Sequence, residues 1–300
     1  MDTLQNLRAF LAVAETRSFS AAARRSQLAT SVLTKRVDQL ERAVKTRLFT
    51  RTTRTVTLTD AGRRWCDRVR SLVADFDDTM REVSDAQQDL EGPIRIKAPT
   101  TLTVLYLAGI LTRFQTLNPR LSMEVVLADR ALNPADEGFD MAIAAFDATF
   151  SEVVDVPLCP LPRMLCAAPN YLAGRQQPRH PRDLIEHDTL SFAPTGSIWS
   201  FNGPQGPATV EVRPRLSVND GQVLLGSALA GNGIALLSEY LIAPALRSGD
   251  LVLVLESYRP PELWVKALVP EARMPVARIS ALVEYLKQAF SPGPPWSSAS

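Results

Sequence analysis

The sequence predicts two folds in one chain: a small helical head with a β-hairpin, and a larger α/β region behind it. Three observations support this prediction. Short amphipathic helical patterns fill residues 4–43, a hairpin pattern covers 48–58, and strand and helix patterns alternate from residue 94 onward. A length of 300 residues also exceeds that of a usual single core, which favours two or three domains.

Three helices are predicted in the head. Apolar residues spaced three and four apart predict the first of them: Leu4, Leu7, Phe10, Leu11 and Ala14. The second covers residues 21–25, with Ser18 or Ser20 as its cap. The third starts near Thr30 or Ser31, each of which is a competent cap.

The third helix and the hairpin after it form a basic surface. The helix exposes a polar face made of Ser31, Thr34, Lys35 and Asp38. Residues 51–54 are the tip of the hairpin, and its arm at 55–58 alternates between polar and apolar residues. A helix with short polar and basic side chains beside an arginine-tipped hairpin has a shape that enters DNA grooves. The head is therefore predicted to bind DNA.

Charge is distributed unevenly along the chain. Residues 1–70 carry 15 Lys and Arg against 6 Asp and Glu, a net +9, whereas residues 71–91 carry −6 and residues 92–300 carry −2. A phosphate backbone is the commonest partner of such a basic block. A solvated charged face is the alternative, and charge alone does not exclude it.

A long helix capped by Thr59 is predicted after the hairpin. Its apolar residues recur mostly at spacings of three and four: Trp65, Val69, Leu72, Phe76, Met80, Val83 and Leu90. Such a narrow seam is typical of two helices that pack together, so we expect dimerisation through it. The alternative is a helix that lies on its own domain. Residues 91–93 (Glu-Gly-Pro) end the helix and mark a domain boundary.

The patterns beyond residue 93 predict an α/β fold with largely parallel sheets. Strands are expected at 94–98, 121–127, 139–143, 163–168, 210–218, 234–237, 251–255 and 264–269. Helices are expected at 102–118, 221–230 and 276–290. The tail 291–300 has turn-forming residues without periodicity and is expected to be disordered.

Several classes of protein are disfavoured. Cys66, Cys159 and Cys166 lack metal-type spacing and are expected to be reduced core residues rather than a redox pair. The sequence has no apolar run of about 18 residues and no signal-peptide pattern, so we expect a cytoplasmic protein without membrane contact. With only His180 and His187 and no serine elbow or phosphate loop, we expect neither an enzyme nor a bound cofactor or metal.

The residues resemble those of LysR-type transcriptional regulators over nearly the whole chain. The strongest segment is Arg47-Leu48-Phe49-x-Arg51-x-x-Arg54-x-Val56-x-Leu58-Thr59-x-Ala61-Gly62, preceded by Ser18-Phe19-x-x-Ala22-Ala23. The resemblance implies a winged helix-turn-helix at 1–59, a linker and dimerisation helix at 60–91, and a two-lobed effector-binding domain at 92–300. That domain would be similar to periplasmic solute-binding proteins, with lobe I at about 92–161 and 269–290 and lobe II at about 162–268. Homotetramers that bind double-stranded promoter DNA are also implied.

The resemblance indicates which residues meet DNA: Thr30, Ser31, Thr34 and Lys35 in the major groove, and Arg54 in the minor groove. A lysine can donate to guanine O6 and N7, and an arginine suits a narrow minor groove. Arg51 is expected either to pack or to bind phosphate. Many members carry Ser/Thr-Gln or Ser/Thr-Pro where this chain has Ala29-Thr30, so its base preference cannot be copied from relatives.

A small-molecule site is expected at the carboxyl ends of strands, where helices begin. The candidates are Thr100, Thr101, Asp129, Phe146, Trp199, Phe201 and Asn219. Amides and hydroxyls at Thr100 and Thr101 would suit a carboxylate, while Trp199 and Phe201 would form an aromatic wall. The alternatives are a helix cap for Asn219 and core positions for the two aromatic residues. Ala144 stands where many relatives have an arginine, which weakens the case for anion binding there.

These observations together predict a transcriptional regulator that binds promoter DNA and responds to a small-molecule effector between two lobes. Homodimers through the linker helix, and homotetramers, are the expected assemblies. A solute-binding receptor without a DNA role is the first alternative, and an α/β enzyme is the least favoured. The basic head and the absent signal peptide argue against the receptor.

Overall fold

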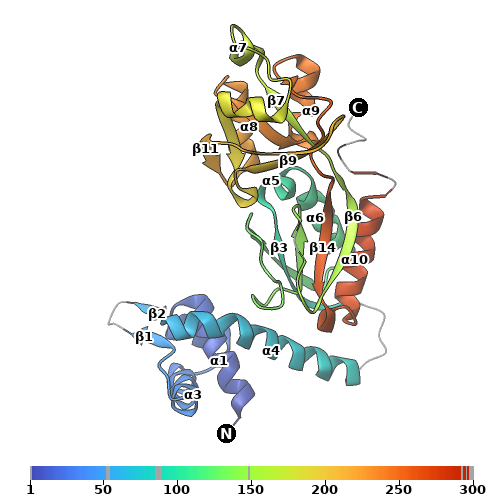
Figure 1. Cartoon of the computed structure of the whole chain (residues 1–300). Coiled ribbons are helices and arrows are strands. Elements are labelled where there is room, and N and C mark those ends of the chain that lie inside the picture. Colours follow the sequence, from blue (N-terminus) through green and yellow to red (C-terminus); the bar gives the residue numbers. More distant parts are fainter. Residues whose placement is uncertain are drawn as a thin grey trace. The chain divides into compact units, whose positions relative to one another are not determined.

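The computed structural model describes residues 2–51, 55–84, 90–147, 149–291, 293–294 and 296. The chain divides into two compact units, Met1–Gln88 with Ala135–Phe139 and Asp89–Pro134 with Asp140–Ser300. The first unit holds the helical head and a long helix, and the second holds two mixed sheets (Figure 1). No helix in the described part of the chain is long and apolar enough to cross a membrane.

The head consists of α1 (Thr3–Thr16), α2 (Phe19–Arg25), α3 (Thr30–Ala43) and a hairpin of β1 (Phe49–Arg51) and β2 (Val56–Leu58). Ser18 caps α2 by accepting a hydrogen bond from the amide of Ala21, as predicted. The cap predicted for α3 is wrong, because that helix begins at Thr30 behind Ala29, which offers no side-chain bond. The inner face of α3 consists of Leu33, Val37 and Leu40, which are buried.

The hairpin is held against α3 by the carboxylate of Glu41, which is 5% exposed. Its Oε1 accepts hydrogen bonds from the amides of Leu48 and Phe49 at 2.8 and 3.1 Å. Its Oε2 accepts one from Arg47 Nη1 at 2.9 Å. A buried carboxylate is stable only when it is paired and hydrogen-bonded, so these contacts fix the start of the hairpin relative to α3.

The long helix α4 (Asp60–Ser84) has two different apolar faces. One face is buried in the core of the head through Cys66, Val69 and Val73. The other face exposes three large side chains: Leu72 by 57%, Phe76 by 45% and Met80 by 55%. The helix therefore packs on its own domain with one face, while its second apolar face is exposed among the described residues.

The single seam predicted along this helix is wrong at both ends. Trp65 and Val69 belong to the core of the head. Leu90 lies outside α4 and packs against the core of the second unit. The side chain of Val83 lies outside the described residues. The uncovered stripe is thus shorter than the sequence spacing indicated.

The second unit has two lobes, each built on a five-stranded sheet. The sheet of lobe I has the order β4-β3-β5-β14-β6, with β3 (Gly92–Ala98), β4 (Leu121–Leu127), β5 (Met141–Ala144), β6 (Val153–Leu161) and β14 (Leu263–Pro270). The sheet of lobe II has the order β11-β8-β12-β7-β13, with β7 (Arg163–Ala167), β8 (Thr189–Phe192), β11 (Pro214–Val218), β12 (Ile234–Ser238) and β13 (Val252–Leu253). A separate hairpin joins β9 (Ile198–Gly203) and β10 (Gly206–Glu211).

Helices cover these sheets. Lobe I carries α5 (Thr100–Leu102), the π-helix η1 (Thr103–Leu107), α6 (Ala108–Leu117), η4 (Glu271–Arg273) and α10 (Ala277–Ala289), with α6 and α10 packed on the sheet (Figure 1). Lobe II carries α7 (Pro169–Leu172), η2 (Pro181–Glu186), η3 (Ala193–Thr195), α8 (Gly221–Leu229) and α9 (Glu239–Ser248). The α/β class predicted from the sequence is confirmed.

Three details of the α/β prediction are wrong. The sheets are mixed rather than largely parallel, because β14, β7 and β13 run antiparallel to their neighbours. The strand predicted at 210–218 is divided between β10 and β11. Lobe II does not extend to residue 268, because β14 pairs with β5 and β6 in the sheet of lobe I from Leu263 onward.

The tail is also more ordered than expected at one residue. Trp296 packs against three aromatic rings, with centroid distances of 5.4 Å to Tyr106, 5.1 Å to Tyr240 and 6.4 Å to Phe290. The prediction of a disordered tail is therefore wrong at Trp296, where aromatic packing outweighs the local turn-forming composition.

Replacing Glu41 with alanine should destabilise the hairpin of the head by about 2–4 kcal/mol, because two buried amides lose their acceptor. Hydrogen exchange of the Leu48 and Phe49 amides measures this loss directly. The control is Glu15→Ala, which removes an exposed ion pair with Arg25 and should cost at most about 1 kcal/mol. Equal protection of both amides in the two variants would contradict the role of Glu41.

Candidate functional site

The amino-terminal half of α3 presents the polar surface that the sequence predicted. Thr30, Ser31 and Lys35 are exposed, and Thr34 is half-buried. Lys35 forms no ion pair with any described residue, so its ammonium group is available to a phosphate or a base edge. Thr34 Oγ1 donates to the carbonyl oxygen of Thr30 at 2.8 Å, which leaves the Thr34 hydroxyl able to accept a hydrogen bond.

Arg51 is already engaged within the head. Its Nη2 donates to Asp38 Oδ1 at 2.7 Å and lies 3.4 Å from Glu41 Oε2, and its guanidinium stacks over the ring of Phe19 at 4.5 Å. Of the two roles left open for Arg51, this geometry favours packing over phosphate binding. Arg54 lies outside the described residues.

A cavity of about 80 Å³ lies between the two lobes of the second unit. Lobe I contributes Pro99, Thr101, Leu102, Asp129, Ala145, Phe146, Leu161 and Leu263. Lobe II contributes Arg163, Phe192, Thr195, Gly221, Leu236, Leu237, Ser238, Tyr240 and Leu241. Most of these residues follow the carboxyl ends of β3, β4, β5, β8 and β12, which is where ligands settle in open α/β sheets.

The two threonines at the start of α5 are bonded to carboxylates of the protein itself. The amide and the hydroxyl of Thr100 both donate to Asp129, the amide at 3.0 Å. Thr101 Oγ1 donates to Asp220 Oδ2 at 3.2 Å, a bond that joins lobe I to lobe II. Asp220 also caps α8 through the amide of Val223. The carboxylate of a ligand would meet two resident carboxylates here, so the prediction of an anion site at Thr100 and Thr101 loses its support.

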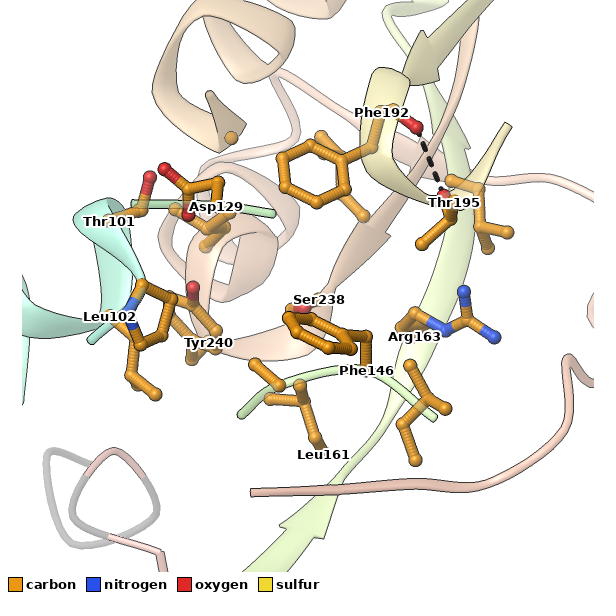
Figure 2. A pocket seen from close by; sticks show the side chains of 17 residues that line it. Thr101, Leu102, Asp129, Phe146, Leu161, Arg163, Phe192, Thr195, Ser238 and Tyr240 are labelled. Atoms are coloured by element: carbon orange, nitrogen blue, oxygen red, sulfur yellow. Dashed lines mark hydrogen bonds between the residues drawn. The ribbon is translucent and has the colours of Figure 1, made fainter. Parts of the chain in front are cut away.

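The structure divides the predicted effector residues into two groups. Thr101, Asp129 and Phe146 line the cavity, with Thr101 and Asp129 at one end of it (Figure 2). Thr100 does not line it and only supports Asp129. Asn219 is exposed and lies outside the lining, and the cap of α8 is Asp220 rather than Asn219.

The aromatic wall predicted at Trp199 and Phe201 is wrong. These side chains are 3% and 1% exposed and belong to a core cluster of lobe II that includes Leu165, Leu184 and Tyr258. Alternation along β9 places both rings on its inner face, whereas Ile198 and Ser200 are exposed. Both rings therefore contribute to the core of lobe II and not to the wall of the cavity.

Four further residues that line the cavity were not selected from the sequence: Arg163, Phe192, Ser238 and Tyr240. Arg163 begins β7, Phe192 ends β8, Ser238 ends β12, and Tyr240 lies in the first turn of α9. Burial raises the pKa of Tyr240, and the negative charges of Asp129 and Asp220 add to the rise, so its hydroxyl stays protonated and can donate.

The cysteines are core residues, as expected. All three are buried. Burial raises the pKa of Cys159 and Cys166 to about 12, which disfavours the reactive thiolate. Among the described residues, no group of three His, Cys, Asp or Glu side chains is arranged to hold a metal ion.

A basic helix and hairpin joined to a two-lobed α/β unit with a cavity between its lobes define a ligand-responsive DNA-binding regulator. Two family models match: the bacterial regulatory helix-turn-helix protein of the lysR family over residues 4–63, and the LysR substrate binding domain over residues 87–291. The chain belongs to the LysR family of transcriptional regulators.

Relatives and solved structures agree with this assignment. The chain is 31% identical to the HTH-type transcriptional regulator PtxR of Pseudomonas aeruginosa, over 95% of this chain and 92% of that protein. It is 31% identical to the HTH-type transcriptional activator TtdR of Escherichia coli, over 94% and 92%. The fold is similar to that of full-length AphB, a Vibrio cholerae virulence activator, with a TM-score of 0.60, 24% identity and coverage of 94% and 98%.

Because Trp199 is a core residue, Trp199→Ala should lower the free energy of unfolding of lobe II by about 3–5 kcal/mol. Phe192→Ala removes a half-buried ring from the cavity wall and should cost clearly less. Urea denaturation of both variants, followed by circular dichroism, compares the two losses. A Trp199 variant as stable as the wild type would return that ring to the cavity wall.

Proposed function

We propose that Thr30, Ser31, Thr34 and Lys35 contact promoter DNA, with α3 in the major groove and the hairpin, including Arg54, beside it. The observation that carries this proposal is the exposed, unpaired Lys35 on the polar face of α3, in a segment with a net charge of +9 over residues 1–70. Arg51 is proposed to position the hairpin through Asp38 and Glu41. We also propose a cytoplasmic location, because the protein acts on promoter DNA.

The domain assignment follows the same division. Residues 1–59 are proposed as the winged helix-turn-helix, residues 60–91 as the linker that contains α4, and residues 92–300 as the effector-binding domain. The cavity between lobes I and II is proposed to hold a small molecule, with Thr101, Asp129 and Phe146 among its contacts. The function is regulatory rather than catalytic.

A homodimer is proposed through the exposed stripe of α4. Leu72, Phe76 and Met80 follow one another at a spacing of four, so they form one continuous apolar face. A second copy of the same helix supplies a complementary face, as in other paired helices. Two half-sites on DNA would then be read by two heads.

A homotetramer is proposed from further apolar side chains on the second unit. Lobe I exposes Val104 by 66% and Leu117 by 65%, and lobe II exposes Val223 by 50% on α8. Contacts between copies through these residues would join two dimers. An effector that changes the arrangement of the lobes would then alter the spacing of the heads on DNA.

Lys35→Ala should weaken binding to the specific promoter about tenfold to a hundredfold if Lys35 reads a base edge. If it binds phosphate instead, binding should weaken on all sequences and the salt dependence should fall by about one unit of slope. Gel-shift titrations on specific and scrambled duplexes at several salt concentrations separate these cases. Lys287→Ala, an exposed lysine of α10, is the matched control. Unchanged affinity and slope in Lys35→Ala would refute the groove assignment.

Phe76→Asp should separate the dimer, because it places a charge in the apolar stripe of α4. Sedimentation velocity of the full chain measures the change in mass. The control is Ile185→Asp, which alters an apolar residue that is 57% exposed on η2 and should leave the assembly intact. A Phe76 variant that sediments like the wild type would show that another surface holds the copies together.

A further inference from the structure

The cavity between the lobes contains one cationic side chain, that of Arg163, among the residues that line it. Arg163 begins β7, directly after the chain has crossed from lobe I at Leu161. It lies at the opposite end of the cavity from Thr101 and Asp129, beside Phe146 (Figure 2). Its cross-strand neighbour is Ser238, whose hydroxyl lines the same cavity.

Arg163 is half-buried, and its guanidinium lacks a partner in the described part of the chain. Its Nε is buried without a hydrogen-bond acceptor, and none of the described carboxylates forms an ion pair with it. Burial lowers the pKa of Arg163, although an arginine stays charged. A neighbouring groove that Arg163 also borders contains Glu239, Glu256 and Glu262, yet none of them pairs with it. A partly buried cation without a counter-ion can bind an anion that enters the cavity.

The other end of the cavity is acidic. Asp129 lines it, and Asp220 lies behind Thr101 as the acceptor of that hydroxyl. Both carboxylates act on the hydroxyl of Tyr240, whose pKa they help to raise. An anionic group therefore meets repulsion at this end and attraction at the Arg163 end.

The rest of the cavity lining is largely apolar and aromatic. Phe146, Leu161 and Leu263 line it from lobe I, and Phe192 and Leu236 from lobe II. Its volume of about 80 Å³ gives room for roughly half a dozen water-sized groups. The ligand that fits this shape is a small acid with a single ring or a short chain.

We propose that Arg163 binds the carboxylate of a small, largely apolar monoanionic effector, whose body lies between Phe146 and Phe192. This inference rests on the proposed function of the cavity and adds to it a chemical class and an orientation. A planar guanidinium can bind a carboxylate through two parallel hydrogen bonds, here from its terminal nitrogens Nη1 and Nη2. The hydroxyl of Ser238 is placed to donate to the same carboxylate.

The test uses the full chain and pairs of acids with their neutral amides: benzoate and benzamide, 3-phenylpropanoate and its amide, and pentanoate and its amide. Thermal-shift titration and calorimetry are applied to the wild type, Arg163→Gln, Arg163→Lys, Phe192→Ala and the exposed-arginine control Arg259→Gln. At least one acid should raise the Tm of the wild type while its amide does not. Arg163→Gln should weaken its binding about tenfold to a hundredfold, and Arg163→Lys should restore part of the loss.

The variants without ligand provide a second readout. Arg163→Gln should melt no lower than the wild type, because its guanidinium has no partner to lose, and a marked drop in Tm would instead assign Arg163 a structural role. The proposal is overturned if no acid binds the wild type, if amides bind as well as acids, or if Arg163→Gln binds the acid normally. If Arg163→Gln binds the acid normally but Phe192→Ala does not, the effector binds in the cavity and Arg163 is not its anchor. Gel shifts of the ligand-free wild type test the regulatory function separately.

Discussion

The second unit depends on two crossings of the chain between its sheets, from β6 to β7 and from β13 to β14. The chain returns to lobe I through β14. The carboxyl ends of β3, β4 and β5 in lobe I and those of β8 and β12 in lobe II then border the same cavity. Helix starts and short loops converge at these ends. The cavity is therefore a consequence of topology, and its chemistry is set by whichever side chains the sequence places there.

The head obeys a different constraint, which is electrostatic. Residues 1–70 carry a net charge of +9, so the hairpin can pack on α3 only if repulsion between their cations is offset. The buried carboxylate of Glu41 meets this requirement by binding two hairpin amides and Arg47, while Arg51 pairs with Asp38. Arg47 and Arg51 are thus paired with acidic residues, whereas Lys35 on the outer face of α3 forms no ion pair with a described residue.

The sequence predicted elements wherever periodicity was strong, and it failed where the deciding contact was distant. The three head helices, the hairpin and most strands of the second unit follow from apolar spacing. Trp199 and Phe201 could not be distinguished from a cavity wall, because only the packing of the β9–β10 hairpin on lobe II shows that they are core. Arg163 carries no local signal at all, because it lines the cavity together with Phe146 and Phe192, which come from other segments of the chain.

The position of Arg163 also indicates how a ligand could influence the lobes. A ligand shifts an equilibrium between two arrangements only as far as it binds one of them better than the other. Two contacts hold the lobes together in the present arrangement: the bond from Thr101 to Asp220, and Trp296 packed against Tyr106 of lobe I and Tyr240 of lobe II. A molecule held by Arg163 in lobe II and by Phe146 in lobe I gains contacts that depend on the distance between the lobes. The free energy of binding therefore depends on the distance between the lobes, which the two contacts named above also restrain. Such a dependence is required for an effector to change the arrangement of the whole protein.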